Sequence, residues 1–170
     1  MAQTSVTNAQ LGSGVVGEFY STEPQGVRTL ILNSASEANN VIGRVVTYVD
    51  GEDQQAGVAA SSRFAGVIGM PKTLARPTLD NITIIDNGTP TQIIRKGYVF
   101  VNLPAVAAKG DFVYWTNATG ALTTVAPDAA PPADSTRVPG GTVEIFNVTA
   151  PSIAVIYVDF AGDKSDSTGA

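Results

Sequence analysis

The chain has 170 residues, a hydrophobic share of 44%, a charged share of only 15% and a net charge of −5. This acidic balance makes a nucleic-acid partner unexpected, because binding to phosphates needs a basic surface, and no apolar stretch approaches the ~18 residues that span a membrane. Cysteine and histidine are both absent. Their absence excludes disulfides, zinc–thiolate sites, Cys nucleophiles and the Ser-His-Asp mechanism, so we predict no catalytic residue, no cofactor and no metal site.

The chain opens with a polar segment, residues 1–14, which is rich in Thr, Asn, Gln and Gly. It has neither the basic region nor the apolar run of a signal peptide. We predict an N-terminal arm without a core of its own. The following residues, 15–20, are expected to form a short strand-like end of this arm.

The next part of the chain predicts short strands separated by turns. Residues 27–33 alternate two leucines against Thr29 and Ile31, which predicts a strand buried on both faces. The stretch 34–40 is the best helix candidate, although it spans at most two turns and has no apolar stripe. Further elements are expected as a strand at 41–49 with Gly43 as a bulge, a turn at 50–51, a polar loop at 52–63 and strands at 64–70 and 81–85.

The centre of the chain carries the strongest sheet signal. The strand predicted at 92–103 alternates strictly in its second half, as a period of two requires. Residues 111–116 include the only Trp, Trp115, among residues that suit a half-buried sheet surface, and 122–125 are expected to pair back after a turn. We predict that these three strands form a meander.

The last third continues the β pattern. The Pro/Ala segment 126–135 cannot join the interior of a sheet, and strands are expected at 142–147 and 152–160. About ten strands, frequent turns and no long amphipathic helix predict an all-β fold, either a β-sandwich of jelly-roll type or a β-barrel. We divide the chain into an extended arm at 1–20, a single all-β domain at 21–160 and a flexible tail at 161–170.

Several polar and aromatic groups leave more than one interpretation open. Tyr114 and Trp115 would suit a sugar-stacking platform, although such residues in a strand more often form core or an oligomer interface. The carboxylates at 50–53 lack the spacing of a calcium loop, and we interpret them as a solvated turn. The pair Arg95-Lys96 is interpreted as a solvated strand start, with contact to an acidic partner surface as the alternative.

The order of these features follows a known pattern between roughly residues 41 and 158. The segment AGVIGMPKTLA is followed by NGTPTQIIRKGYVFVNLPAVAAKGDFVYWTNATGALTTVAP, a Pro/Ala stretch, GGTVEIFN and IAVIYV. In this order and texture the chain resembles the head decoration or structural cement proteins of tailed bacteriophages. These are small all-β proteins that bind the outside of the capsid shell, and the resemblance transfers no individual functional residue.

The resemblance implies a non-enzymatic virion protein, made in the host cytoplasm, that lies on the outer capsid surface and cements the shell by bridging major capsid protein subunits. It also implies a homo-oligomer, with a trimer preferred over a dimer, since symmetric capsid positions favour symmetric binders. The alternatives are a phage tail or baseplate β-domain and a carbohydrate-binding module. We expect the N-terminal arm to bind the major capsid protein through Thr4, Val6, Leu11, Val15, Val16, Phe19 and Tyr20.

Overall fold

A computed structural model describes residues 14–21, 25–59, 61, 63–70, 84–146 and 152–160. Over these residues the protein consists of nine β-strands and a single 3-10 turn, η1 (Glu37–Asn39), which confirms the all-β prediction. The strands are β1 (Gly26–Leu32), β2 (Val45–Tyr48), β3 (Gln55–Gly57), β4 (Phe64–Ile68), β5 (Pro90–Leu103), β6 (Phe112–Thr116), β7 (Leu122–Val125), β8 (Ser135–Phe146) and β9 (Ser152–Asp159). In this part of the chain no helix is long and apolar enough to cross a membrane.

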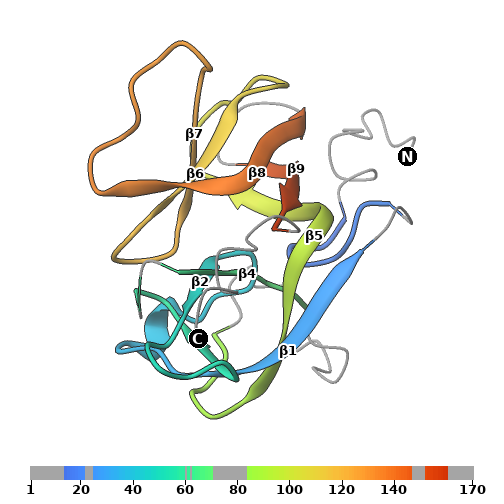
Figure 1. Cartoon of the computed structure of the whole chain (residues 1–170). Coiled ribbons are helices and arrows are strands. Elements are labelled where there is room, and N and C mark those ends of the chain that lie inside the picture. Colours follow the sequence, from blue (N-terminus) through green and yellow to red (C-terminus); the bar gives the residue numbers. More distant parts are fainter. Residues whose placement is uncertain are drawn as a thin grey trace, which may run out of the picture.

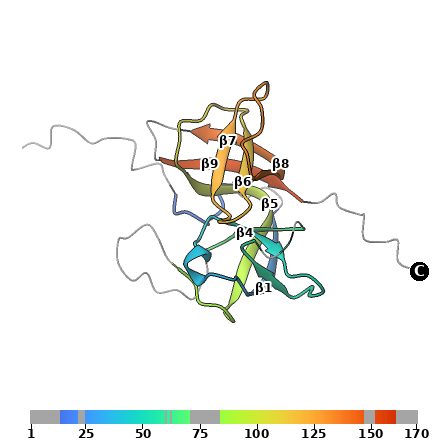
Figure 2. The same cartoon turned by 90° about the vertical axis from the view of Figure 1, so that its left-hand side faces the viewer.

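All nine strands belong to one hydrogen-bonded sheet with the order β1-β3-β2-β4-β5-β9-β8-β6-β7. An additional antiparallel pairing of β1 with β5 closes the first five strands of this order into a barrel. The long strand β5 serves both parts, because its first half pairs with β1 and its second half with β9. The barrel and the group formed by β6 to β9 meet along β5, as Figures 1 and 2 show.

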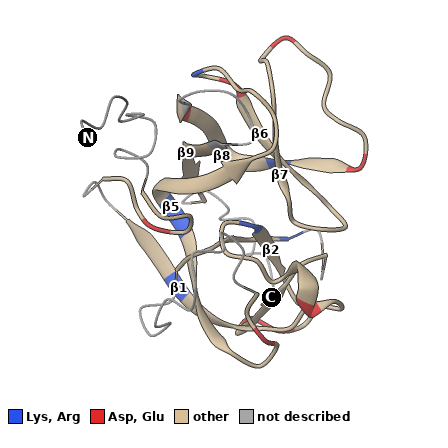
Figure 3. Ribbon diagram, turned by 180° about the vertical axis from the view of Figure 1, so that it is seen from behind, with Lys and Arg blue, Asp and Glu red and all other residues tan. Residues whose placement is uncertain are grey.

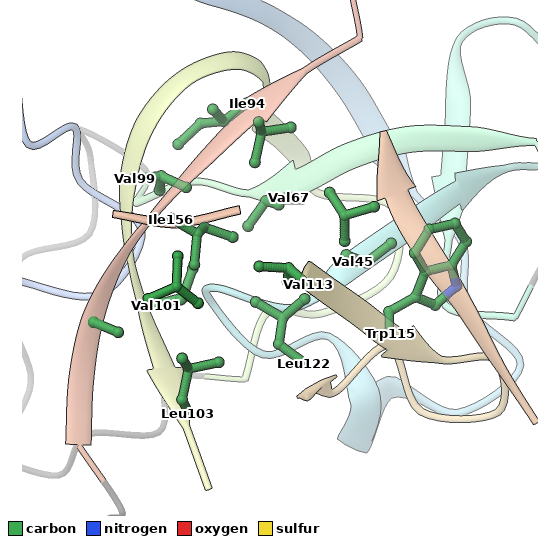
Figure 4. Packing of buried hydrophobic residues seen from close by; sticks show 14 of the residues in the cluster. Val45, Val67, Ile94, Val99, Val101, Leu103, Val113, Trp115, Leu122 and Ile156 are labelled. Atoms are coloured by element: carbon green, nitrogen blue, oxygen red, sulfur yellow. The ribbon is translucent and has the colours of Figure 1, made fainter. Parts of the chain in front are cut away.

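Two hydrophobic cores lie on opposite sides of a wall made by β2, β4 and the first half of β5. Successive side chains of a strand point to opposite faces. Val46, Ile68 and Ile93 therefore point into the barrel, whereas their neighbours Val45, Val67 and Ile94 point into the second core. Figure 4 shows Val45 and Val67 directed toward Val113 of β6. This double role explains why β2 and β4 are buried on both faces.

The prediction that the first strand is buried on both faces is wrong. In β1 only Leu30 and Leu32 are buried, while Val27 and Ile31 are 44% and 39% exposed. The reason is that β1 lies on the outer wall of the barrel, where one face meets the core and nothing in the described residues covers the other.

The helix predicted at 34–40 is also wrong, because only the 3-10 turn η1 forms there. Polar side chains bind other loops and hold the segment in an irregular path. Ser34 donates its hydroxyl hydrogen to Asn40 Oδ1 (2.5 Å), and Asn40 Nδ2 donates to Asn87 Oδ1 (2.9 Å). Asn87 Nδ2 donates in turn to the backbone oxygen of Ser34 (2.8 Å). Such side-chain bonds compete with helical ones.

The predicted three-stranded meander is wrong as a unit. The hairpin of β6 and β7 forms as expected, with Trp115 opposite Leu122, but β5 does not pair with β6. Strands β9 and β8 lie between them in the sheet. The physical reason is length, since β9 pairs with β5 from Lys96 to Leu103, a longer ladder than the five-residue β6 could supply.

Smaller differences concern the ends of elements. The strand predicted at 15–20 contributes only a bridge between Phe19 and Val99, and Gly43 lies in a turn before β2 instead of a bulge within it. The predicted polar loop contains β3, because Ala56 is fully buried in the barrel. Strand β8 begins at Ser135, seven residues before the predicted start of 142. The strand predicted at 81–85 is described only at its last two residues, and the tail 161–170 lies outside the described residues.

Candidate binding interface

The root of the predicted arm is attached to β5 by backbone hydrogen bonds. Gly17 N–H donates to the oxygen of Phe100 (2.8 Å), Phe100 N–H donates to Glu18 (3.0 Å) and Tyr20 N–H donates to Tyr98 (2.9 Å). These bonds lie on the same edge of β5 as the pairing with β1, because residues 17–20 continue the line of that strand. Residues 14–21 are therefore fixed against the body of the protein.

Gly17 is the position in this root whose backbone conformation requires glycine. Its φ of +85° lies in the left-handed region that L side chains rarely adopt. A Cβ at this position would also overlap the Ile42 side chain and lie 2.8 Å from the backbone nitrogen of Met70. Met70 N–H donates to the Gly17 oxygen (2.9 Å), so the root is bonded on a second side as well.

The candidate arm residues fall into different environments. Thr4, Val6 and Leu11 lie outside the described residues, and Val15 is partly buried. Val16 packs against the barrel core and Phe19 against the second core. Tyr20 is 49% exposed, and its ring meets Phe100 edge-on with the centroids 5.6 Å apart. The described structure therefore gives Val16 and Phe19 anchoring contacts within the chain and leaves Tyr20 open to a partner.

Exposed apolar side chains mark the surface beside this root. The exposed large hydrophobic residues of the described chain are Tyr20, Val27, Ile31, Ile84 and Val106. Three of the five lie along one line, formed by the arm root and β1. Sequence reasoning did not name Val27 and Ile31, because apolar residues at alternate positions of a short strand indicate burial. The pairing of β1 with β5 was needed to place them outside.

The aromatic pair proposed as a sugar platform is buried. Trp115 is 4% exposed and lies 5.4 Å from Phe64, centroid to centroid, and Tyr114 is 8% exposed. A sugar ring needs an accessible aromatic face to stack on. The interpretation of these residues as core is confirmed, and the carbohydrate-binding alternative loses the residues on which it rested.

Some charged groups on the described surface form ion pairs. Arg63 binds Asp53 (3.0 Å) and Lys96 binds Asp159 (3.2 Å). Arg44, which donates to Asn39 Oδ1 (3.0 Å), has a pKa below its usual value because it is partly buried. In the described ranges no three acidic side chains are grouped so that they could hold a metal ion.

Comparisons with known proteins agree with this geometry. The sequence matches the family described as "Structural cement protein (E217 gp24/Pam3 gp6)" over residues 2–159. Among solved structures, a chain from "The capsid of Myoviridae Phage XM1" has a TM-score of 0.61 at 16% sequence identity, covering 94% of this chain and 98% of that chain. At this identity the likeness concerns the fold. No curated protein matches the sequence significantly.

Proposed function

The chain belongs to the phage structural cement protein family, and on this premise we propose that it binds the exterior of a phage capsid and bridges major capsid protein subunits. The observation that carries the proposal is the extent of the family match, which runs over residues 2–159 of a 170-residue chain. The fold shared with a chain of the phage XM1 capsid structure supports the same class of protein, a virion component.

A cement protein works by burying area across seams of the shell, and each contact is expected to cover on the order of 1,000 Å² or more. No chemical group is needed for this task. A homotrimer on a local threefold position would multiply each contact by three and raise the overall avidity without new chemistry. We prefer the trimer over the dimer on this ground.

We assign the arm two mechanical roles. Val16 and Phe19 anchor its root in the two cores, and the root is bonded to β5, which pairs with β1, β4 and β9. A force applied to the arm is therefore transmitted to β5, the strand shared by both halves of the fold. Thr4, Val6, Leu11, Val15 and Tyr20 are the residues proposed to meet the major capsid protein.

Binding to heads that lack the protein tests this function. Purified wild-type chain and a variant without residues 1–13 are mixed with such heads, pelleted and imaged. We expect regular protrusions at local symmetry positions for the wild type, which also report the oligomer number. The shortened chain, which retains the described root, should unfold at the same temperature and leave the heads bare. Full occupancy by the shortened chain would exclude the arm as the contact, and density at the tail would favour the tail or baseplate alternative.

A further inference from the structure

Among the residues that the structure describes, strand β1 has no strand partner along one side of its first half. Ile31 N–H donates to Gln54 beside β3 (2.9 Å), whereas Leu32 N–H donates to Thr89 beside β5 (3.2 Å). Because successive residues of a strand direct their N–H and C=O groups to opposite sides, Val27 and Thr29 direct theirs to the same side as Ile31. Strand β3 pairs only with Ile31 and Leu32, so those four backbone groups have no ladder partner among the described residues.

The side chains of this open edge are apolar or β-branched. Val27, Thr29 and Ile31 share the outer face of β1 and are exposed, and the exposed Pro90 lies opposite Ile31 in the register with β5. Exposed edges are commonly protected by lysine, proline or a bulge, because they otherwise pair with another chain. Between Val27 and Ile31 the only charged residue is Arg28. The edge is thus suited to the addition of one more strand.

One cationic side chain, that of Arg28, lies on this edge. The exposed Arg28 donates to the Tyr48 hydroxyl (3.1 Å) and has no carboxylate partner in the described part of the chain. Arg95 of β5 is turned away from this edge, because its guanidinium lies over the Phe160 ring (4.6 Å) beside β9. In Figure 3 the blue segment of β1 stands apart from that of β5, which has a red segment beside it. A carboxylate from a partner would complement Arg28.

The charges restrict which strand can fill the edge. Two copies of β1 paired antiparallel through Val27 and Thr29 would place Arg28 directly opposite its own copy, and like charges in that position are destabilising. Residues 1–13, the remainder of the chain's own arm, contain no acidic residue to pair with Arg28. The other end of the edge adjoins the acidic loop 50–53, because Ile31 N–H donates to Gln54, so a partner carboxylate is expected opposite Arg28 and not beside Ile31.

We propose that the open edge of β1 binds an extended segment of the shell protein by strand addition. The segment would carry apolar or β-branched residues at alternate positions and an Asp or Glu opposite Arg28. This inference rests on the proposed function, which supplies the partner. This contact would be a second one, besides that of the arm. The arm root and β1 pair with the same edge of β5, so together they form one continuous surface.

A substitution at Thr29 tests the proposal. Thr29→Pro removes an N–H on the open side and places a ring in the path of an added strand, but leaves the bonds to β5 intact. Thr29→Val keeps the N–H and is the matched control. We expect Thr29→Pro to weaken binding to heads by about tenfold or more, and Thr29→Val to bind like the wild type. Equal binding by both folded variants would overturn the proposal, whereas failure of the wild type to bind would refute the proposed function itself.

A second measurement does not depend on the proline variant folding. Hydrogen exchange of wild-type protein, free and on heads, reports the Val27 and Thr29 amides directly. We expect rapid exchange in the free protein and protection on heads, and Arg28→Glu should lose this protection while Arg28→Lys retains it. Unchanged exchange on decorated heads would refute strand addition. Protection in the free protein that disappears when residues 1–13 are deleted would identify the chain's own arm as the occupant and overturn the proposal.

Discussion

Replacement of Gly17 by alanine is expected to detach the arm root. Alanine at a φ of +85° costs about 1 kcal/mol relative to glycine. The added methyl group also meets the Ile42 side chain and the backbone of Met70, and such overpacking costs about 1–3 kcal/mol. The free energy of holding the root in place should therefore fall by about 2–4 kcal/mol.

Gly51→Ala is the matched control for this substitution. Gly51 has a similar φ, +77°, but an added Cβ would meet nothing within 4 Å. The control should therefore lose about 1 kcal/mol, from the backbone alone. The difference between the two variants isolates the steric contact at the arm root.

The assay is hydrogen exchange at Phe100, whose N–H donates to the Glu18 oxygen of the root. Local opening of the root exposes this amide without global unfolding. We expect its protection to fall by about thirtyfold or more in Gly17→Ala and to stay unchanged in Gly51→Ala, with weaker binding to heads only in the former. Equal protection of Phe100 in the two variants would refute the view that residues 17–20 are held by this geometry.

Three further predictions concern other contacts. Tyr20→Ala should reduce binding to heads, while the unfolding temperature changes by no more than a few degrees, because the side chain is half exposed; a large loss of stability would contradict this placement. Asn87→Ala should lower the free energy of unfolding in urea by about 2–3 kcal/mol, since it removes three hydrogen bonds to Ser34 and Asn40; a loss below about 0.5 kcal/mol would refute the structural role of this network. Trp115 should fluoresce like a buried indole, and neither iodide nor added glycans should change its emission; strong quenching by either would contradict its burial.

Much of the local structure could be predicted from the sequence. The alternation of apolar and polar residues and the residues that favour turns determine backbone conformation over only a few neighbouring positions. The hairpin of β6 and β7 is an example, since Gly120 takes a φ of +66° in the turn that the sequence indicated. Burial on both faces was misassigned, however. The property belongs to β2 and β4, which divide two cores, whereas β1 has one exposed face. The alternation of residue types indicates that a strand has two faces. It does not indicate which other strands or solvent each face contacts.

The candidate interface shows the same limit. The polar composition of residues 1–14 predicts an arm, of which the described structure contains only the root, and this arm stays a prediction. The fixed root at Gly17 and the open edge at Val27 and Thr29 could not be predicted in this way. Both depend on which segments pair with β5, and these segments are separated from β5 by many residues in the chain.

The sequence by itself determined the all-β class, most strand positions and the resemblance to phage cement proteins, because these follow from local patterns and their order. Only the tertiary structure decided that β9 and β8 separate β5 from β6, that β1 closes a barrel and that the first half of β1 has one edge without a described strand beside it. The physical reason is competition between strands: each of several apolar strands can pair with β5, and the longest ladders that also bury both cores are the ones that form.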